Sequence, residues 1–293
     1  MTAADLHAFD NPSGDHDGTL PAAAPVVPRL VATDLDGTLL DRDRAITPRT
    51  VAALRACAAA GIEVVFVTAR PPRTVTPLVD AVGVSATAIC SNGAIVLDCA
   101  TGQATVVHEF AFADGRRLVE QLRPVLPDAG FALESGQESW HEAAFRLGTV
   151  SGHTARLAAD LDEVWERIGR VVKILVRSPT LTADEMAAAA LAAVTVPAEI
   201  SHSGGQGLLE IAPPGATKSA ALAALCAARG VAAAQVAAFG DMPNDLPMLR
   251  WAGLSYAVAN AHPTVLAAAS RVTAAHDEDG VALALEELLA AAG

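Results

Sequence analysis

Two aspartates separated by one residue, Asp34 and Asp36, have the clearest chemical potential of any side chains in this sequence. They follow an apolar run at residues 30–32, typical of a buried strand, and they precede Gly37, which permits a sharp turn. Paired carboxylates offer the hard oxygen ligands that Mg²⁺ requires, and either one is also able to attack an electrophile or carry a proton. The alternative is an acidic loop after a core strand, because a bare Asp-x-Asp pattern has little specificity.

A strand-helix-strand unit is predicted to place a second polar motif beside these aspartates. The run 62–67 is nearly all apolar, as expected of a strand covered on both faces, and it leads directly into Thr68 and Arg70. Thr47 followed by proline predicts that a helix begins between the two strands. Because such crossovers are right-handed and bring the carboxyl ends of both strands to one edge, we expect Thr68 to lie near Asp34.

An inserted domain is predicted after the third strand. Residues 91–93, Ser-Asn-Gly between two apolar runs, are a hairpin signal, so the pairing is expected to become antiparallel there. From residue 97 to 207 the pattern mixes helices with strands, which indicates an α+β domain. Its predicted elements are helices over 114–126, 154–168 and 182–193 and a strand over 172–176.

Two further polar motifs follow this insertion. Lys218 falls in the first turn of an alanine-rich helix, where the helix dipole disfavours a cation unless an anion such as phosphate binds there. A lysine that extends into solvent is the alternative. The apolar strand 236–239 leads into Asp241, Asn244 and Asp245, which repeats the pattern of the opening aspartates, although acidic turns without a metal are also common.

Composition limits the classes of protein to which the chain can belong. Its 293 residues suggest about two domains. A net charge of −13 disfavours nucleic acid and anionic membranes as partners, so an anionic substrate must meet a local positive cluster. No apolar run reaches the roughly 18 residues of a membrane span, the four cysteines form no Cys-x-x-Cys pair, and no signal-peptide pattern begins the chain. We therefore expect a soluble, cytoplasmic protein with reduced thiols, of undefined oligomeric state.

Together, these motifs resemble the haloacid dehalogenase superfamily, and in particular its Cof-type phosphatases, which carry a large α/β cap between their second and third motifs. The resemblance extends from about residue 29 to the C-terminus. It implies a Rossmann-like parallel sheet with helices on both faces, formed by residues 29–96 and 208–293, with an inserted α+β cap at 97–207 and a flexible tail at 1–28. The matching motifs are at residues 34–38, 68–70, 91–94, 214–218 and 240–245, with further similarity at 260–263 and 277–280. Ala69 departs from the family pattern, which usually has glycine there.

The resemblance also implies a reaction, namely hydrolysis of small phosphorylated metabolites such as sugar phosphates. Asp34 would attack phosphorus and form an aspartyl phosphate, and Asp36 would act as general acid and then as general base. Mg²⁺ would be bound by Asp34, the backbone carbonyl of Asp36, and Asp241.

The remaining motif residues would bind phosphate or support the site. Asp245 would orient the ligands without touching phosphate, and Arg70 would reach either the phosphate or the leaving group. The residues expected to hydrogen-bond the phosphoryl oxygens are Thr68, Lys218 and Asn244.

Two other functions are compatible with the same motifs. A phosphomutase would pass the phosphoryl group to a sugar hydroxyl rather than to water, and a phosphometabolite-binding protein would have lost turnover. A P-loop kinase is disfavoured, since Thr217 rather than glycine precedes Lys218.

Overall fold

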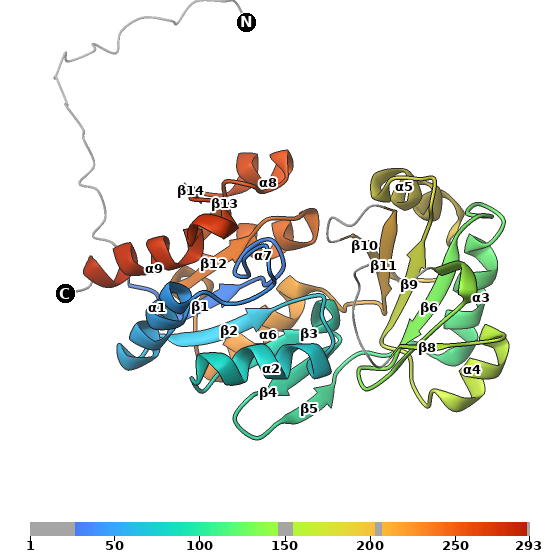
Figure 1. The fold of residues 1–293 in the computed structure, drawn as a ribbon, viewed down its shortest axis with the longest axis horizontal. Coiled ribbons are helices and arrows are strands. Elements are labelled where there is room, and N and C mark those ends of the chain that lie inside the picture. Colours follow the sequence, from blue (N-terminus) through green and yellow to red (C-terminus); the bar gives the residue numbers. More distant parts are fainter. Residues whose placement is uncertain (1–26, 146–154, 203–206, 292–293) are drawn as a thin grey trace, which may run out of the picture.

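An eight-stranded, mostly parallel sheet forms the larger part of the molecule (Figure 1). The computed structural model describes residues 27–145, 155–202 and 207–291. Strand order is β14-β13-β12-β1-β2-β3-β4-β5, and all neighbours from β14 to β3 are parallel, whereas β4 and β5 are antiparallel. The strands are β1 (Leu30–Thr33), β2 (Glu63–Val67), β3 (Thr87–Cys90), β4 (Ile95–Asp98), β5 (Gln103–Val106), β12 (Val236–Gly240), β13 (Leu254–Val258) and β14 (Arg271–Thr273).

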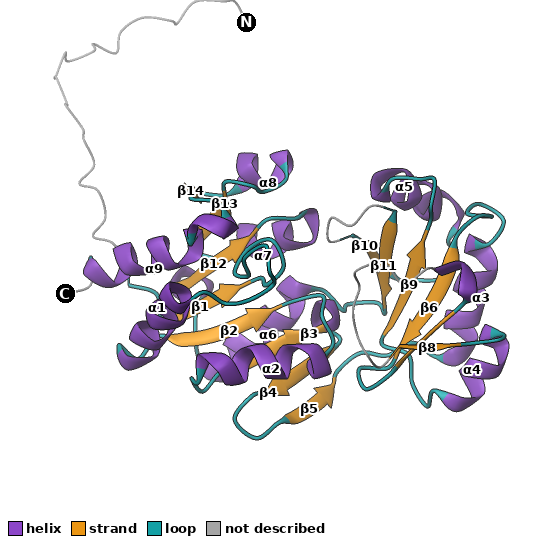
Figure 2. Ribbon diagram, viewed as in Figure 1, coloured by secondary structure: helices purple, strands orange, loops and turns teal. Residues whose placement is uncertain are grey.

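Helices cover both faces of this sheet, which explains why its central strands are mostly apolar and almost entirely buried (Figures 1 and 2). Helix α1 contacts α2 and α9, and α7 contacts both α6 and α8. The predicted start of α1 is confirmed, because the Thr47 side chain accepts a hydrogen bond from the Thr50 N–H and Pro48 is the first helical residue. The helices are α1 (Pro48–Ala59), α2 (Pro72–Val82), α6 (Lys218–Arg229), α7 (Leu246–Trp251), α8 (Pro263–Ala268) and α9 (Gly280–Ala290).

A second, six-stranded sheet lies beside the first, in the order β10-β11-β9-β6-β7-β8. We call it, with its helices, the cap. Helices α3 (Phe112–Leu122), α4 (Leu161–Arg167) and α5 (Ala183–Ala193) pack on the face turned away from the first sheet (Figure 1). The strands are β6 (Gly130–Glu134), β7 (Ser139–His141), β8 (Ala155–Leu157), β9 (Lys173–Arg177), β10 (Glu199–Ser201) and β11 (Leu208–Ala212).

The α/β class with an added α+β unit is confirmed, but the predicted limits of the insertion are wrong at both ends. The first sheet continues through β5, so it does not end at residue 96. Strand β11, expected in the first sheet, pairs with β9 and β10 in the cap. Sheet membership depends on distant pairing partners, which a local apolar run does not reveal.

Three other expectations bear on the chain outside the parallel sheet. The prediction of a helix over 154–168 is wrong in its first half, because residues 155–157 form β8, which pairs in parallel with β7. The tail predicted at residues 1–28 lies outside the described residues, apart from its last two positions. None of the described helices is long and apolar enough to cross a membrane.

Candidate active site

The carboxyl ends of three neighbouring parallel strands bring the predicted motifs together. Strand β1 lies between β12 and β2, with Thr33 in register with Phe239 on one side and Phe66 on the other. Asp34 therefore emerges beside the end of β12, and its backbone N–H donates to the Phe239 carbonyl at 3.0 Å. Thr68, directly after β2, is buried at the same edge. The crossover argument from the sequence correctly predicted this neighbourhood.

Three buried carboxylates, those of Asp34, Asp241 and Asp245, form a cluster at this edge. One oxygen from each lies within 4.8 Å of the others. Lys218 sits among them, and its Nζ donates to Asp34 Oδ1 at 2.6 Å and to Asp245 Oδ1 at 2.7 Å. The Lys218 side chain is 2% exposed, so it does not extend into solvent. The structure thus excludes the solvated-lysine alternative.

Local backbone structure holds these charged groups in position. Thr217 caps α6 by accepting from the Ala220 N–H, which makes Lys218 the first helical residue. Asp245 Oδ2 accepts the backbone N–H groups of Asp241 and Met242, each at 3.1 Å. Asp245 therefore uses one oxygen for Lys218 and the other for the loop after β12, so its orientation is fixed from both sides.

Burial and mutual repulsion change the protonation of the cluster. Burial raises the pKa of Asp34 well above its ordinary value, with Asp245 and Asp241 adding to the shift and Lys218 opposing it. Burial, reinforced by the charge of Asp245, raises the pKa of Asp241 to about 7. Burial alone would lower the pKa of Lys218, but Asp245 and Asp34 outweigh it, so the pKa lies above its ordinary value and the ammonium stays charged.

The residues fit a hard divalent cation. Three carboxylates share one ammonium, so the fully ionised cluster carries excess negative charge in a buried setting. Burial is the main cause of the raised pKa values of Asp34 and Asp241, and repulsion among the carboxylates adds to it; a bound cation would relieve that repulsion. Carboxylate oxygens are the donors that ions such as Mg²⁺ prefer.

The side chain of Asp36 lies outside this cluster. Arg70 grips both of its oxygens, with Nε to Oδ2 at 2.6 Å and Nη2 to Oδ1 at 2.5 Å. Arg70 is tied back to the second motif, because its backbone N–H donates to Thr68 Oγ1 at 3.1 Å. The acidic cluster thus contains Asp245 in addition to Asp34 and Asp241, whereas the predicted ligand on Asp36 is its backbone carbonyl and not its carboxylate.

Asn244 lies at the rim of the site. Its Nδ2 is 3.5 Å from Asn92 Oδ1, and within the described ranges its own Oδ1 is buried without a hydrogen-bond partner. An unpartnered buried oxygen is compatible with a ligand-facing group. Asn92 was not among the predicted site residues, although the Ser-Asn-Gly motif that contains it was.

Two further residues near the site were missed as individual contributors. Thr38 donates to Asp241 Oδ1 at 2.7 Å and so orients that carboxylate. Asn260 donates to the Gly37 carbonyl at 2.8 Å, which fixes the turn between the two opening aspartates and Thr38. Both lie within motifs that the sequence singled out, but their roles depend on contacts between residues about 200 positions apart.

Comparisons with known proteins agree with this geometry. A family model described as haloacid dehalogenase-like hydrolase matches residues 31–285. The pyridoxal phosphate phosphatase YbhA of Escherichia coli is 26% identical over 266 residues, covering 87% of this chain and 96% of that protein. A phosphoglycolate phosphatase of Haloarcula marismortui is 29% identical over 249 residues, covering 84% and 91%.

The fold has close counterparts among solved structures. SMU.1108c from Streptococcus mutans superimposes with a TM-score of 0.78 at 24% identity, covering 90% of this chain and 99% of that one. With the family model spanning most of the residues described, including both sheets, the chain belongs to the haloacid dehalogenase-like hydrolases, and the prediction of a Cof-type phosphatase of that superfamily is confirmed.

Proposed function

We propose that the chain is a Mg²⁺-dependent phosphatase that hydrolyses small phosphorylated metabolites through an aspartyl phosphate formed on Asp34. The observation that carries this proposal is the convergence of Asp34, Asp241 and Lys218 at one buried strand edge. A nucleophilic carboxylate, a further carboxylate for a cation and an ammonium for the phosphoryl oxygens are the groups that this chemistry needs.

In the first step a carboxylate oxygen of Asp34 forms a bond to phosphorus while the bond from phosphorus to the leaving oxygen breaks. Lys218, whose Nζ lies 2.6 Å from Asp34 Oδ1, and the buried Thr68 hydroxyl would donate to the transferring phosphoryl oxygens. Asp34 and Asp241 would hold Mg²⁺, which would supply positive charge against the repulsion between the nucleophile and the phosphate dianion. Asp245, whose two oxygens already bind Lys218 and the backbone, orients these groups.

Asp36 moves the protons in both steps. It first protonates the leaving oxygen, and it then takes a proton from the water whose oxygen attacks phosphorus as the bond to Asp34 breaks. Its side chain is 44% exposed and lies outside the acidic cluster, so it remains accessible to a leaving group and to water. Arg70 binds both Asp36 oxygens and must release one of them for each transfer.

The substrate class is proposed from the relatives. The Escherichia coli and Haloarcula marismortui proteins are named for pyridoxal phosphate and phosphoglycolate, which are both small phosphomonoesters. The net charge of −13 also favours a substrate whose anionic part is confined to the region of Lys218.

Phosphate release from an aryl phosphate and from a panel of sugar and cofactor phosphates, with and without Mg²⁺, tests the proposal. We expect Mg²⁺-dependent release that Asp34→Asn lowers by roughly 10³-fold or more. Asp43→Asn, in an exposed turn of the same loop, is the matched control and should retain activity. Equal rates for the Asp34→Asn variant and the parent would refute the assignment. Isomerised sugar phosphate without net phosphate release would indicate a mutase instead.

A further inference from the structure

Three charged side chains of the cap project from the sheet face that α3, α4 and α5 leave uncovered. Glu134 on β6 is directly opposite Lys173 on β9 in the strand register, and Glu210 lies on the adjacent strand β11. Their exposed fractions are 3%, 4% and 2%. Buried charges are costly unless they are paired, so the partners of this row are informative.

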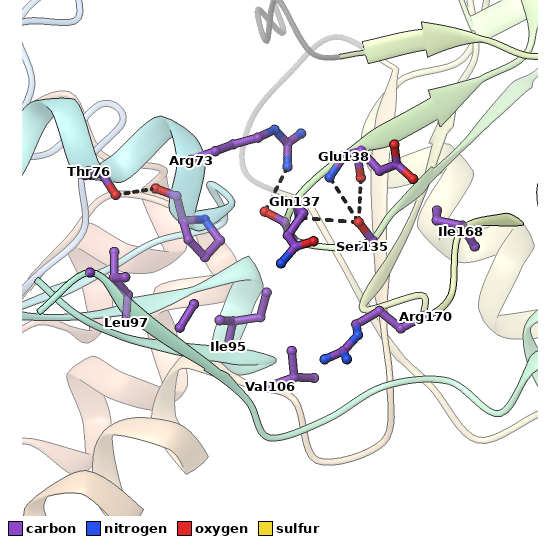
Figure 3. Close-up of a pocket in the computed structure, with 14 residues that line it drawn as sticks. Arg73, Thr76, Ile95, Leu97, Val106, Ser135, Gln137, Glu138, Ile168 and Arg170 are labelled. Carbon is purple, nitrogen blue, oxygen red and sulfur yellow. Dashed lines mark hydrogen bonds between the residues drawn. The ribbon is translucent and has the colours of Figure 1, made fainter.

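Those partners include groups of the first sheet and its loops. Arg73 of α2 binds Glu134 through Nη1 at 2.6 Å and Nη2 at 2.7 Å, and its Nη1 also reaches the Gly136 carbonyl. Figure 3 shows Arg73 extending from α2 toward the cap turn that carries Ser135, Gln137 and Glu138. This ion pair ties the cap to α2, beside a pocket that residues of both the cap and the first sheet line.

Lys173 makes the contact closest to the proposed chemistry. Its Nζ donates to the carbonyl of Ala69 at 2.6 Å and to Glu210 Oε2 at 2.8 Å. Ala69 stands between Thr68 and Arg70, so the cap ammonium holds the peptide that links the two predicted phosphate-side residues. The sequence has only two lysines, Lys173 and Lys218, and both are buried beside carboxylates.

Glu210 extends this contact to a second loop of the site. Asn92 donates to Glu210 Oε2 at 3.0 Å, while the backbone N–H of Asn92 donates to the Thr68 carbonyl at 3.0 Å. Ser91 and Asn92 both have left-handed backbone conformations, with φ of 51° and 57°. Such a conformation persists only where surrounding contacts hold it, and Glu210 supplies one of them.

We propose that Lys173 is a positioning residue, whose contact with the Ala69 carbonyl fixes Thr68 and Arg70 for phosphoryl transfer when the cap lies against the first sheet. The inference rests on the proposed function and deepens it. Lys173 itself touches no reacting atom. It acts by ordering the 68–70 loop, and Glu210 both balances its charge and orders the 91–92 loop.

The test uses the full chain and three variants at this pair. Lys173→Met removes the ammonium, and Lys173→Arg keeps the charge. The first change takes the Lys173 ammonium away from the buried Glu210 carboxylate, which is itself costly. Lys173→Met combined with Glu210→Gln also removes that negative charge. Arg123→Met is the matched control, since Arg123 pairs with Glu142 within the cap.

Hydrogen exchange of backbone amides and turnover of an aryl phosphate are measured in parallel. In the double variant we expect roughly tenfold faster exchange confined to peptides covering residues 68–72 and 91–94. We also expect kcat to fall roughly 10- to 100-fold, the scale of a small misplacement of a catalytic group. KM should change much less, Lys173→Arg should recover most of the loss, and Arg123→Met should match the parent.

Other results would overturn either the inference or the proposed function on which it rests. Unchanged exchange in the 68–72 peptides would show that Lys173 does not hold the loop, and faster exchange throughout the cap would show a merely structural role. A loosened loop with unchanged kcat would separate the contact from the chemistry. A parent protein that releases no phosphate would refute the proposed function, whereas the exchange measurement, which needs no substrate, would still decide whether Lys173 holds the loop.

Discussion

Arg70 and Asp36 form a two-point ion pair, with Nε to Oδ2 at 2.6 Å and Nη2 to Oδ1 at 2.5 Å, at the edge of the buried acidic cluster. The pair separates the two opening aspartates by environment. Asp34 is buried among Lys218, Asp241 and Asp245, whereas Asp36 is 44% exposed and held by an arginine. Two carboxylates in such different settings are suited to different tasks.

Asp36→Asn should lower kcat by roughly 10²- to 10⁴-fold, the contribution of a general acid and base. Mg²⁺ affinity should change little, because the Asp36 carboxylate lies outside the acidic cluster. Asp241→Asn, which removes a member of that cluster, should instead weaken Mg²⁺ binding. Phosphate-release kinetics and calorimetric titration with Mg²⁺ separate the two effects. Equal loss of Mg²⁺ affinity in both variants would contradict this division of roles.

Gly37→Ala should displace a site residue in addition to straining the backbone. Gly37 has φ of +79°, and a Cβ there would lie 2.4 Å from Asp241 Oδ2. Gly61 has φ of +77° with open space around it, so Gly61→Ala is a matched control that carries only the backbone penalty, about 1–2 kcal/mol. We expect both variants to lose that much unfolding free energy, but only Gly37→Ala to lose Mg²⁺ binding and turnover. Normal turnover by Gly37→Ala would show that the Asp241 carboxylate can move without consequence.

The stabilisation of the folded protein by Mg²⁺ should increase between pH 6 and pH 8. Burial and Asp245 raise the pKa of Asp241 to about 7, so at pH 6 the metal-free folded protein holds a proton there that a cation must displace. The unfolded chain has lost that proton by pH 6, so this group makes the metal-free protein less stable as the pH rises toward 7. Thermal unfolding with and without Mg²⁺ across this range measures the effect. Asp241→Asn should flatten the pH dependence, and an unchanged slope in that variant would assign it to another group.

Lys218→Met should abolish most turnover while leaving a cation site. The ammonium donates to both Asp34 and Asp245, so it lies beside the proposed nucleophile. Its removal takes away a hydrogen-bond donor to the transferring phosphoryl group, which should lower kcat roughly 10²- to 10³-fold. The three carboxylates remain, and their repulsion is no longer offset by a fixed cation. Mg²⁺ should therefore raise the melting temperature of the variant at least as much as that of the parent. A variant that Mg²⁺ no longer stabilises would mean that Lys218 is needed to build the cluster itself.

By itself, the sequence determined where the chemistry lies. Apolar runs at residues 30–32, 62–67 and 236–239 each lead into polar side chains, and parallel strands with right-handed crossovers necessarily bring such ends to one edge. This rule predicted that Asp34, Thr68 and Asp241 would be neighbours, because hydrophobic patterning is local and the crossover rule applies to any pair of parallel strands in one sheet.

Only the tertiary structure decided which distant groups meet. The assignment of β5 and β11 to their sheets depends on hydrogen-bonding partners, and the strand at 155–157 depends on pairing with β7. The sequence does not reveal that Glu134, Lys173 and Glu210 lie side by side, since these residues belong to three separate strands. The partners of these three side chains are decided when the two sheets and their loops pack together. The order of residues along the chain does not show which side chains will meet there.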